Sequence, residues 1–142
     1  MKISSVIAHK GDFVATVAPE DTVWSLLGTL AEYKIGAVVV SSDGNAIAGI
    51  ASERDIVRAL QEQDASILDS PVSEIMSKIV ATCTPDSTVE ELMVQMTEQR
   101  VRHIPVIADG NLVGIVSIGD VVKARIELLE DERKSLVSYI TS

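Results

Sequence analysis

Several kinds of residue are scarce in this sequence, and each shortage excludes a class of protein. The 142 residues include one cysteine, Cys83, and two histidines, too few for an internal disulfide or a structural zinc site. We therefore expect no metal and a reducing, cytoplasmic location. No segment approaches the roughly 18 uninterrupted apolar residues of a membrane span, and the N-terminus lacks a long apolar signal. We expect neither membrane insertion nor export.

Positive charge and aromatic rings are also in short supply. The formal net charge is −9 at pH 7, and aromatic residues make up 3% of the chain. A nucleic-acid-binding surface needs positive charge and commonly uses rings for base stacking. We therefore expect no nucleic-acid partner. Hydrophobic residues make up 46%, which is enough for the core of one ordinary globular body.

Catalytic signatures are missing as well. Neither GxGxxG nor GxxxxGK[ST] occurs, and His9 has no obvious partner that would make it a general base. The acidic stretch 127–132 is typical of a solvated helix face. We expect a protein that binds a ligand without turning it over, and no catalytic residue is assigned.

What the sequence does contain is an internal repeat. Residues 14–19 (VATVAP) align with residues 80–85 (VATCTP), 66 positions apart. After one extra residue in the first copy, residues 49–55 align with residues 114–120, 65 positions apart. A unit this short cannot bury its own apolar face, so the copies must pack together about a pseudo-two-fold axis. Clefts between them should therefore occur in near-equivalent pairs.

Each copy begins with a short strand and an amphipathic helix. Apolar residues recur with a helical period over 23–30 and again over 89–96. Thr88 and Glu91, three residues apart, form a capping box that defines the start of the second of these helices.

A β-hairpin and a second helix complete each copy. The hairpins are predicted over residues 37–51 and 103–116, each with an Asp-Gly-Asn turn. The helices that follow begin near Asp55 and Asp120. Each copy therefore has the order β-α-β-β-α, which predicts an α+β fold of two pseudo-symmetric lobes with small sheets.

The repeat also divides the chain. We assign the first repeat to residues 8–62, a linker to 63–74, the second repeat to 75–127 and a C-terminal helical extension to 128–142. The extension continues the last helix with an apolar stripe interrupted by Arg133: Val122, Ile126, Leu129, Leu136 and Ile140. On pattern alone this stripe either covers the core or forms a dimer contact.

Two further motifs strengthen the repeat signal. Each copy closes on a Gly-hydrophobic-x-Ser-x-x-Asp string behind the same hairpin, and the second copy has the segment 102–106 (RHIPV). Together these features resemble a tandem pair of cystathionine β-synthase (CBS) domains, a Bateman module. The resemblance covers nearly the whole chain. It implies a regulatory module that binds an adenosine-containing ligand such as AMP, ADP, ATP or NAD between two CBS-type repeats.

Physical chemistry points to the same Ser and Asp residues. Ser117 and Asp120 lie where a strand ends and a helix begins, and Ser52 and Asp55 take these places in the first copy. Free N–H groups at a helix start favour an anion, a carboxylate can accept both ribose hydroxyls, and a serine can donate to phosphate. The alternative is that each Asp only caps its helix. Because the Ser–Asp spacing occurs twice, we favour binding.

A basic cluster sets the second copy apart. Arg100, Arg102 and His103 occupy the positions of Lys34, Gly36 and Ala37, and an arginine fork beside a histidine suits a phosphate. The resemblance implies that His103 lies near the phosphate, with the adenine on backbone of the other lobe. The residues predicted for this first site are Ser117, Asp120, His103, Arg102, Thr16, Ile35, Gly36 and Asp12.

The mirrored second site is expected to be the weaker one, because Ala37 leaves it without the matching histidine. Its predicted residues are Ser52, Arg54, Asp55, Thr82, Val101 and Ile79. Tyr33 and Trp24, on the first amphipathic helix, are interpreted as core or interface packing.

These observations leave three functional hypotheses. The first is an adenine-nucleotide sensor that acts on an unidentified partner protein by a conformational change. The second is a constitutive dimerisation or scaffold module without a ligand. The third keeps ligand binding but changes the ligand to S-adenosylmethionine or a related thioether. The resemblance also implies a homodimer, either head-to-head or head-to-tail.

Overall fold

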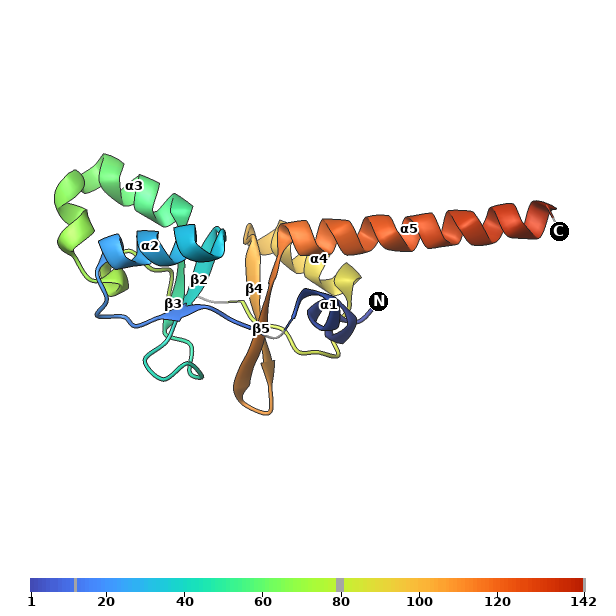
Figure 1. The fold of residues 1–142 in the computed structure, drawn as a ribbon, viewed down its shortest axis with the longest axis horizontal. Helices are drawn as coiled ribbons and strands as arrows, with labels where there is room; N and C mark the ends of the chain where they lie inside the picture. The colour runs from blue at the N-terminus through green and yellow to red at the C-terminus, as the bar shows by residue number, and fades with distance from the viewer. Residues whose placement is uncertain (12, 79–80, 142) are drawn as a thin grey trace.

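The structure is a computed structural model that describes residues 1–11, 13–78 and 81–141. Figure 1 shows two lobes side by side, with one long helix projecting beyond the second lobe. The elements in chain order are α1 (Ile3–Lys10), β1 (Thr16–Val17), α2 (Val23–Tyr33), β2 (Ala37–Val40), β3 (Gly49–Ser52), α3 (Glu53–Gln63), η1 (Ala65–Asp69), η2 (Val72–Glu74), α4 (Val89–Gln99), β4 (His103–Ala108), β5 (Asn111–Ser117) and α5 (Ile118–Thr141). The predicted α+β class is confirmed.

The two helices that follow the leading strands begin and end alike. The predicted capping box of α4 is confirmed: the Glu91 N–H donates to Thr88 Oγ1 at 3.2 Å, and the Thr88 N–H donates to Glu91 Oε2 at 3.4 Å. Both α2 and α4 end in a left-handed residue, Lys34 and Arg100, each at φ 54°. The repeat therefore extends to the turn that leads into each hairpin.

The hairpins form the centre of two separate small sheets. In the first lobe β1 pairs parallel with β2, and β2 pairs antiparallel with β3. In the second lobe β4 and β5 pair antiparallel, while the leading strand is reduced to a bridge between Cys83 and Val106. The β4–β5 turn places Asp109 at φ 52° and Gly110 at φ 78°, as a type I′ turn requires.

Each lobe has its own hydrophobic core, and the two cores are built from equivalent positions. Val17, Val23 and Leu26 in the first lobe correspond to Cys83, Val89 and Leu92 in the second. Burial of each aliphatic side chain contributes roughly 1.5–3 kcal/mol, so each core holds its own lobe together. The lobes are therefore two copies of one packing arrangement.

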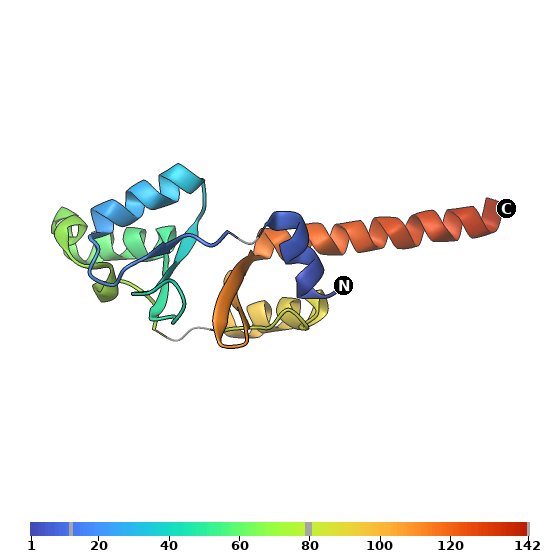
Figure 2. The same cartoon turned by 60° about the horizontal axis from the view of Figure 1, so that its bottom comes forward.

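The segment that precedes each repeat packs on the other repeat. Ile3, at the start of α1, is fully buried in the second lobe, and Val72, in η2, is fully buried in the first. The Ile3 N–H donates to Ser87 O at 2.8 Å, and the Val72 N–H donates to the equivalent carbonyl, Asp21 O, at 2.7 Å. Figure 2 shows α1 beside the start of α5, in the second lobe. Residues 63–74, predicted as a linker, thus supply core side chains.

Two equivalent glycines accommodate these exchanged segments. A Cβ at Gly49 would lie 2.5 Å from the Ser77 carbonyl oxygen, and a Cβ at Gly114 would lie 2.5 Å from Ile7 Cδ1. Because real Cβ contacts are longer than this, the glycine in each Gly-hydrophobic-x-Ser string allows the exchanged segment to approach.

The lobes also meet at their hairpin loops. Asn45 Nδ2 donates to Asn111 Oδ1 at 2.7 Å, and these two residues are equivalent in the repeat. A contact between equivalent residues lies close to the pseudo-two-fold axis that relates the copies.

The C-terminal extension is helical as far as Thr141. α5 runs unbroken from Ile118 to Thr141, and its second half projects away from both lobes in Figures 1 and 2. Its outer side chains are well exposed, for example 63% for Leu136 and 77% for Ile140. No helix within the described ranges is both long and apolar enough to cross a membrane.

Candidate functional site

Among the described residues, two clefts lie between the lobes, as the repeat predicts. The first cleft has a volume of about 350 Å³ and the second, named here the arginine cleft, about 460 Å³. The first cleft is lined by Lys10, Phe13, Ala15, Tyr33, Lys34, Ile35, Gly36, Ala37, His103, Ile115 and Ser117. The arginine cleft is lined by Gly36, Ile50, Ser52, Glu53, Arg54, Asp55, Arg58, Ser77, Ala81, Arg100, Val101, Arg102 and His103.

In the arginine cleft, Ser52 and Asp55 form a reciprocal cap at the start of α3. The Ser52 N–H and hydroxyl donate to Asp55 Oδ2 at 2.9 and 3.0 Å, and the Asp55 N–H lies 3.3 Å from Ser52 Oγ. Ser52 is the N-cap of α3 and Asp55 follows it by three residues, which is the spacing of a capping box. The alternative interpretation, that the aspartate caps its helix, therefore explains part of the Ser–Asp pattern. Asp55 Oδ1 still faces Arg58 Nη1 at 3.6 Å.

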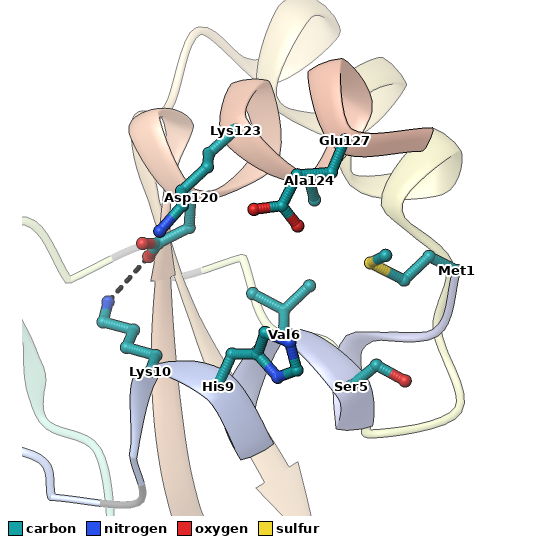
Figure 3. A pocket seen from close by; sticks show the side chains of 9 residues that line it. All are labelled: Met1, Ser5, Val6, His9, Lys10, Asp120, Lys123, Ala124 and Glu127. Carbon is teal, nitrogen blue, oxygen red and sulfur yellow. Dashed lines mark hydrogen bonds and ion pairs between the residues drawn. The ribbon is translucent and has the colours of Figure 1, made fainter. Parts of the chain in front are cut away.

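At the other helix start, the equivalent pair has an additional partner. The Ser117 N–H donates to Asp120 Oδ2 at 2.9 Å, and the Asp120 N–H donates to Ser117 Oγ at 3.1 Å. Lys10 Nζ donates to the same Asp120 oxygen at 2.7 Å and to Ile115 O at 2.8 Å. Figure 3 shows the Lys10 side chain reaching from the end of α1 to Asp120.

This contact favours the ionised form of Asp120. Burial by itself would raise the pKa of the carboxyl, but the hydrogen bond from Lys10 and those from Ser117 outweigh it, so the pKa is lowered. Asp120 is therefore ionised and already paired with an ammonium group. A ribose at this position would have to displace Lys10 or share the carboxylate with it.

His103 stands between the two clefts and lines both. It lies opposite Ser117 in the β4–β5 register, as Ala37 lies opposite Ser52 in the first lobe. Burial lowers the pKa of His103, and the charges of Lys10 and Arg102 lower it further against the opposing effect of Asp120. The imidazole is thus favoured in its neutral form, with one donor and one acceptor nitrogen.

Four of the eight residues predicted for the first site line the first cleft, whereas Asp120 lines a smaller hollow between α1 and α5. The first cleft brings together Ser117, His103, Ile35 and Gly36. Thr16 does not line it, because Thr16 pairs with Val39 inside the sheet and its neighbour Ala15 takes that place. Arg102 lines the arginine cleft instead, because it precedes β4 and successive residues there point to different sides. Asp12 lies outside the described residues.

The predicted second site also converges, and it is the more basic of the two. Ser52, Arg54, Asp55 and Val101 line the arginine cleft. Thr82 does not; Ala81 lines the cleft, and the Thr82 carbonyl accepts a hydrogen bond from Gln95 Nε2 at 3.4 Å. Ile79 lies outside the described residues.

The second site has no equivalent histidine, but a histidine of the other lobe lines it. Although Ala37 replaces the equivalent histidine in the first lobe, His103 of the second lobe lines the arginine cleft as well as the first cleft. A residue at the boundary between two pseudo-symmetric clefts serves both, which a comparison of equivalent positions does not predict.

Comparison with known families identifies the repeat. The family model described as the CBS domain matches the chain twice, over residues 9–62 and 72–127, and these matches cover more than half of the chain. The chain belongs to the CBS domain family. The predicted tandem CBS pair is therefore confirmed.

Individual relatives agree. The CBS domain-containing protein CBSX3, mitochondrial, of Arabidopsis thaliana is 39% identical over 125 residues, which span 85% of this chain and 61% of that protein. The crystal structure of the CBS-domain protein ATU1752 from Agrobacterium tumefaciens superposes with a TM-score of 0.84 at 46% identity, covering 88% of this chain and 99% of that one. The CBS domain pair of protein MJ0100, crystallised with 5-methylthioadenosine and S-adenosyl-L-methionine, shares the fold at 21% identity, with a TM-score of 0.77 over 87% of this chain and 94% of that one.

Several residues of the CBS pair's clefts escape sequence reasoning. Lys10 reaches Asp120 across 110 positions, and no local pattern indicates that contact. Phe13 and Tyr33 line the first cleft with ring centroids 5.1 Å apart and exposures of 66% and 44%, so Tyr33 is a cleft residue and not a core residue. Arg58 could be predicted from the sequence, because it follows Arg54 by about one helical turn and therefore lies on the same face of the helix.

Trp24 is also not a core residue, because its side chain is 67% exposed on the surface of α2. A smaller hollow of about 200 Å³ lies between α1 and α5, and both Lys10 and Asp120 line it (Figure 3). Within residues 1–11, 13–78 and 81–141, no group of three or more His, Cys, Asp or Glu side chains could hold a metal ion.

Proposed function

We propose that this CBS pair is a regulatory module that binds an adenosine-containing ligand in the arginine cleft and acts without catalysis. The observation that carries the proposal is the cleft itself: Ser52 and Asp55 from one lobe face Arg100, Arg102 and His103 from the other. The hydroxyl and carboxylate suit a ribose and phosphate, and the arginines suit phosphate oxygens. A ligand held between them contacts both lobes.

The first cleft is the less suitable of the two for such a ligand. Asp120 does not line it and is paired with Lys10 Nζ at 2.7 Å, whereas Asp55 lines the arginine cleft and its Oδ1 faces Arg58 at the longer distance of 3.6 Å. We therefore assign one ligand to each chain.

Regulation would follow from the position of the ligand between the lobes. A ligand that binds one relative lobe geometry better than another shifts the population toward it by no more than that difference in affinity. The change would be transmitted to a partner protein that contacts both lobes. A reducing compartment such as the cytoplasm fits the module, because Cys83 is a buried free thiol.

The proposal is tested by thermal unfolding and calorimetric titration of the full chain with adenosine, AMP, ADP, ATP, NAD, S-adenosylmethionine and GTP. A ligand at about 100 times its dissociation constant adds roughly 2.7 kcal/mol of stability, or several degrees in a domain of this size. We expect adenine nucleotides to give such a shift. S-adenosylmethionine alone would indicate the thioether ligand, and no shift with any compound would support the scaffold hypothesis.

A cleft-blocking variant locates the ligand. Gly36 lines both clefts, and an added Cβ there meets no atom within 4 Å, so Gly36→Leu should fold and obstruct binding. Gly28→Leu is the matched control, because Gly28 lies in α2, also with nothing within 4 Å of an added Cβ. Equal affinity in the two variants would contradict a site between the lobes.

Dimerisation through α5 is the second candidate function, favoured by its exposed stripe. Val122, Ile126, Leu129, Leu136 and Ile140 follow the alternating three- and four-residue spacing of a coiled coil. Arg133 falls in the same stripe with its side chain 77% exposed. We propose a homodimer in which two such helices pack together.

Molar mass in solution tests the dimer, measured for the full chain and for a chain ending at residue 127. We expect the full chain to be a dimer and the shortened chain a monomer. Leu136→Glu with Ile140→Glu should give the same monomer without removing the helix. A dimer that survives in both variants would exclude α5 as the contact.

A further inference from the structure

The arginine cleft contains an unusual share of the chain's positive charge. Four of the six arginines in the sequence line it: Arg54, Arg58, Arg100 and Arg102. The chain as a whole has a formal net charge of −9. Arginines scattered at random over an acidic surface would not gather in one cavity.

These arginines are mostly without an internal counter-ion. Arg58 Nη1 lies 3.6 Å from Asp55 Oδ1. For Arg54, Arg100 and Arg102, no ion pair is formed with any residue that the structure describes. The two carboxylates of the cleft, Glu53 and Asp55, are outnumbered two to one, so the cavity keeps a positive excess.

The arginines are divided evenly between the lobes. Arg54 and Arg58 lie one turn apart on α3, whereas Arg100 and Arg102 lie in the short segment between α4 and β4. Like charges from the two lobes repel one another across the cleft unless an anion lies between them. A bound anion would therefore bring together two lobes whose facing surfaces are both positive.

The number of arginines bears on the size of that anion. Each guanidinium offers a planar fork that can engage two oxygens, and a single phosphate has three free oxygens and a charge of about −2. Four forks divided between two lobes are served better by a chain of phosphates, which offers more oxygens and more negative charge than one phosphate does. The cleft volume of about 460 Å³, within the usual range for small-molecule sites, has room for a nucleotide.

We propose that the arginine cleft selects a ligand with a phosphate chain, a nucleoside triphosphate or longer polyphosphate, over a nucleoside monophosphate. The inference rests on the proposed function, since it assigns the ligand class of the same site. The terminal phosphates lie between Arg54 and Arg58 of one lobe and Arg100 and Arg102 of the other. The nucleoside lies toward Ser52 and Asp55.

The test is calorimetric titration of the full chain with AMP, ATP and inorganic tripolyphosphate, without divalent cations and at several salt concentrations. We expect ATP to bind at least about tenfold more tightly than AMP, with a steeper loss of affinity as salt rises. Equal affinity and equal salt dependence for AMP and ATP would overturn the inference while leaving a nucleotide site in place.

Two variants, one from each lobe, identify the arginines responsible. Arg54→Gln and Arg102→Gln should each weaken the binding of ATP by about tenfold or more and the binding of AMP by less. The ratio of ATP affinity to AMP affinity should therefore fall. Both side chains are exposed, so the fold should persist. The matched control is Arg125→Gln, because Arg125 pairs with Glu90 at 3.6 Å on α5 and α4, away from the cleft. An unchanged ATP-to-AMP ratio in both variants would overturn the inference.

Tripolyphosphate separates this inference from the proposed function. If tripolyphosphate binds as tightly as ATP and depends on Arg54 and Arg102, the phosphate-chain site is supported and the requirement for adenosine fails. If AMP and adenosine bind and ATP binds no more tightly than AMP, the proposed adenosine site is supported and the phosphate-chain site is contradicted.

Discussion

Lys10 Nζ lies 2.7 Å from Asp120 Oδ2, although the two residues are 110 positions apart in the chain. The contact joins the last residue of α1 to the first turn of α5, and it fills one of two pseudo-equivalent carboxylate positions with the protein's own ammonium group. The other carboxylate, Asp55, forms an ion pair with Arg58 instead. Two copies of one sequence unit thus give two clefts of different chemistry.

Replacement of Lys10, which lines the first cleft, should release the neighbouring carboxylate of Asp120. In Lys10→Met the ammonium is removed while an apolar side chain of similar length remains, so Asp120 becomes free to accept ribose hydroxyls. We expect the number of adenine-nucleotide sites found by calorimetry to rise from one to two per chain. Lys34→Met is the control, since Lys34 lines the same cleft without such a contact. A count of one site in Lys10→Met at saturating nucleotide would contradict this.

His103 should make stability depend on pH. Its folded-state pKa is lowered from the ordinary value of 6.5 by burial and by Lys10 and Arg102, so the unfolded chain binds more protons. The folded state favours the neutral imidazole, so the contribution of His103 to the free energy of unfolding is fully present above pH 6.5. It is lost as the pH falls through the folded-state pKa. Urea unfolding from pH 5 to 7.5 should show stability rising with pH in the wild type, and less so in His103→Gln.

Lys10→Met tests the cause of that shift. Removing a nearby cation should raise the pKa of His103 toward its ordinary value, measured by NMR titration of the ring protons. A pKa that stays where it was in the wild type would leave burial and the charge of Arg102 as the causes.

Alanine should be tolerated less well at Gly49 than at the equivalent Gly114. An alanine Cβ at Gly49 meets the Ser77 carbonyl, which is backbone, whereas at Gly114 it meets the end of the flexible Ile7 side chain. We expect Gly49→Ala to lower the free energy of unfolding by roughly 1–3 kcal/mol and Gly114→Ala by less. Ile7→Val removes Cδ1, so the pair Ile7→Val and Gly114→Ala should be less than additive by urea unfolding.

Cys83 should be unreactive in the folded protein. Burial raises the pKa of its thiol to about 11, so at pH 8 roughly one molecule in a thousand carries the thiolate that attacks disulfide reagents. A chromogenic aromatic disulfide should therefore modify Cys83 slowly in buffer and rapidly in urea. Fast modification of the folded chain would mean that the Cys83 bridge to Val106 opens readily.

Sequence reasoning succeeds where the interaction is local. The Thr88–Glu91 capping box and the hairpins depend on residues within a few positions of one another, and the structure contains them. The repeat also predicts paired clefts, because two copies related by a pseudo-two-fold axis must present equivalent surfaces. It predicts that Ser52 and Asp55 lie in one such cleft.

Reasoning from equivalent positions fails where the symmetry is broken by a contact. Arg102 was assigned to the cleft with Ser117, but its position before β4 turns it toward the other cleft. His103 lines both clefts, and Tyr33 lies at a cleft rim. Each of these outcomes depends on the direction of a side chain at the boundary between lobes, which hydrophobic periodicity does not describe.

The sequence by itself determined the unit: its helices, hairpins, caps and duplication follow from hydrogen bonds and apolar spacing within short stretches of chain. Only the tertiary structure decided that the segments containing Ile3 and Val72 exchange between lobes, and that Lys10 reaches Asp120. The physical reason is that these contacts join residues far apart in the chain. Their existence depends on how two finished lobes pack, and no local pattern contains that information.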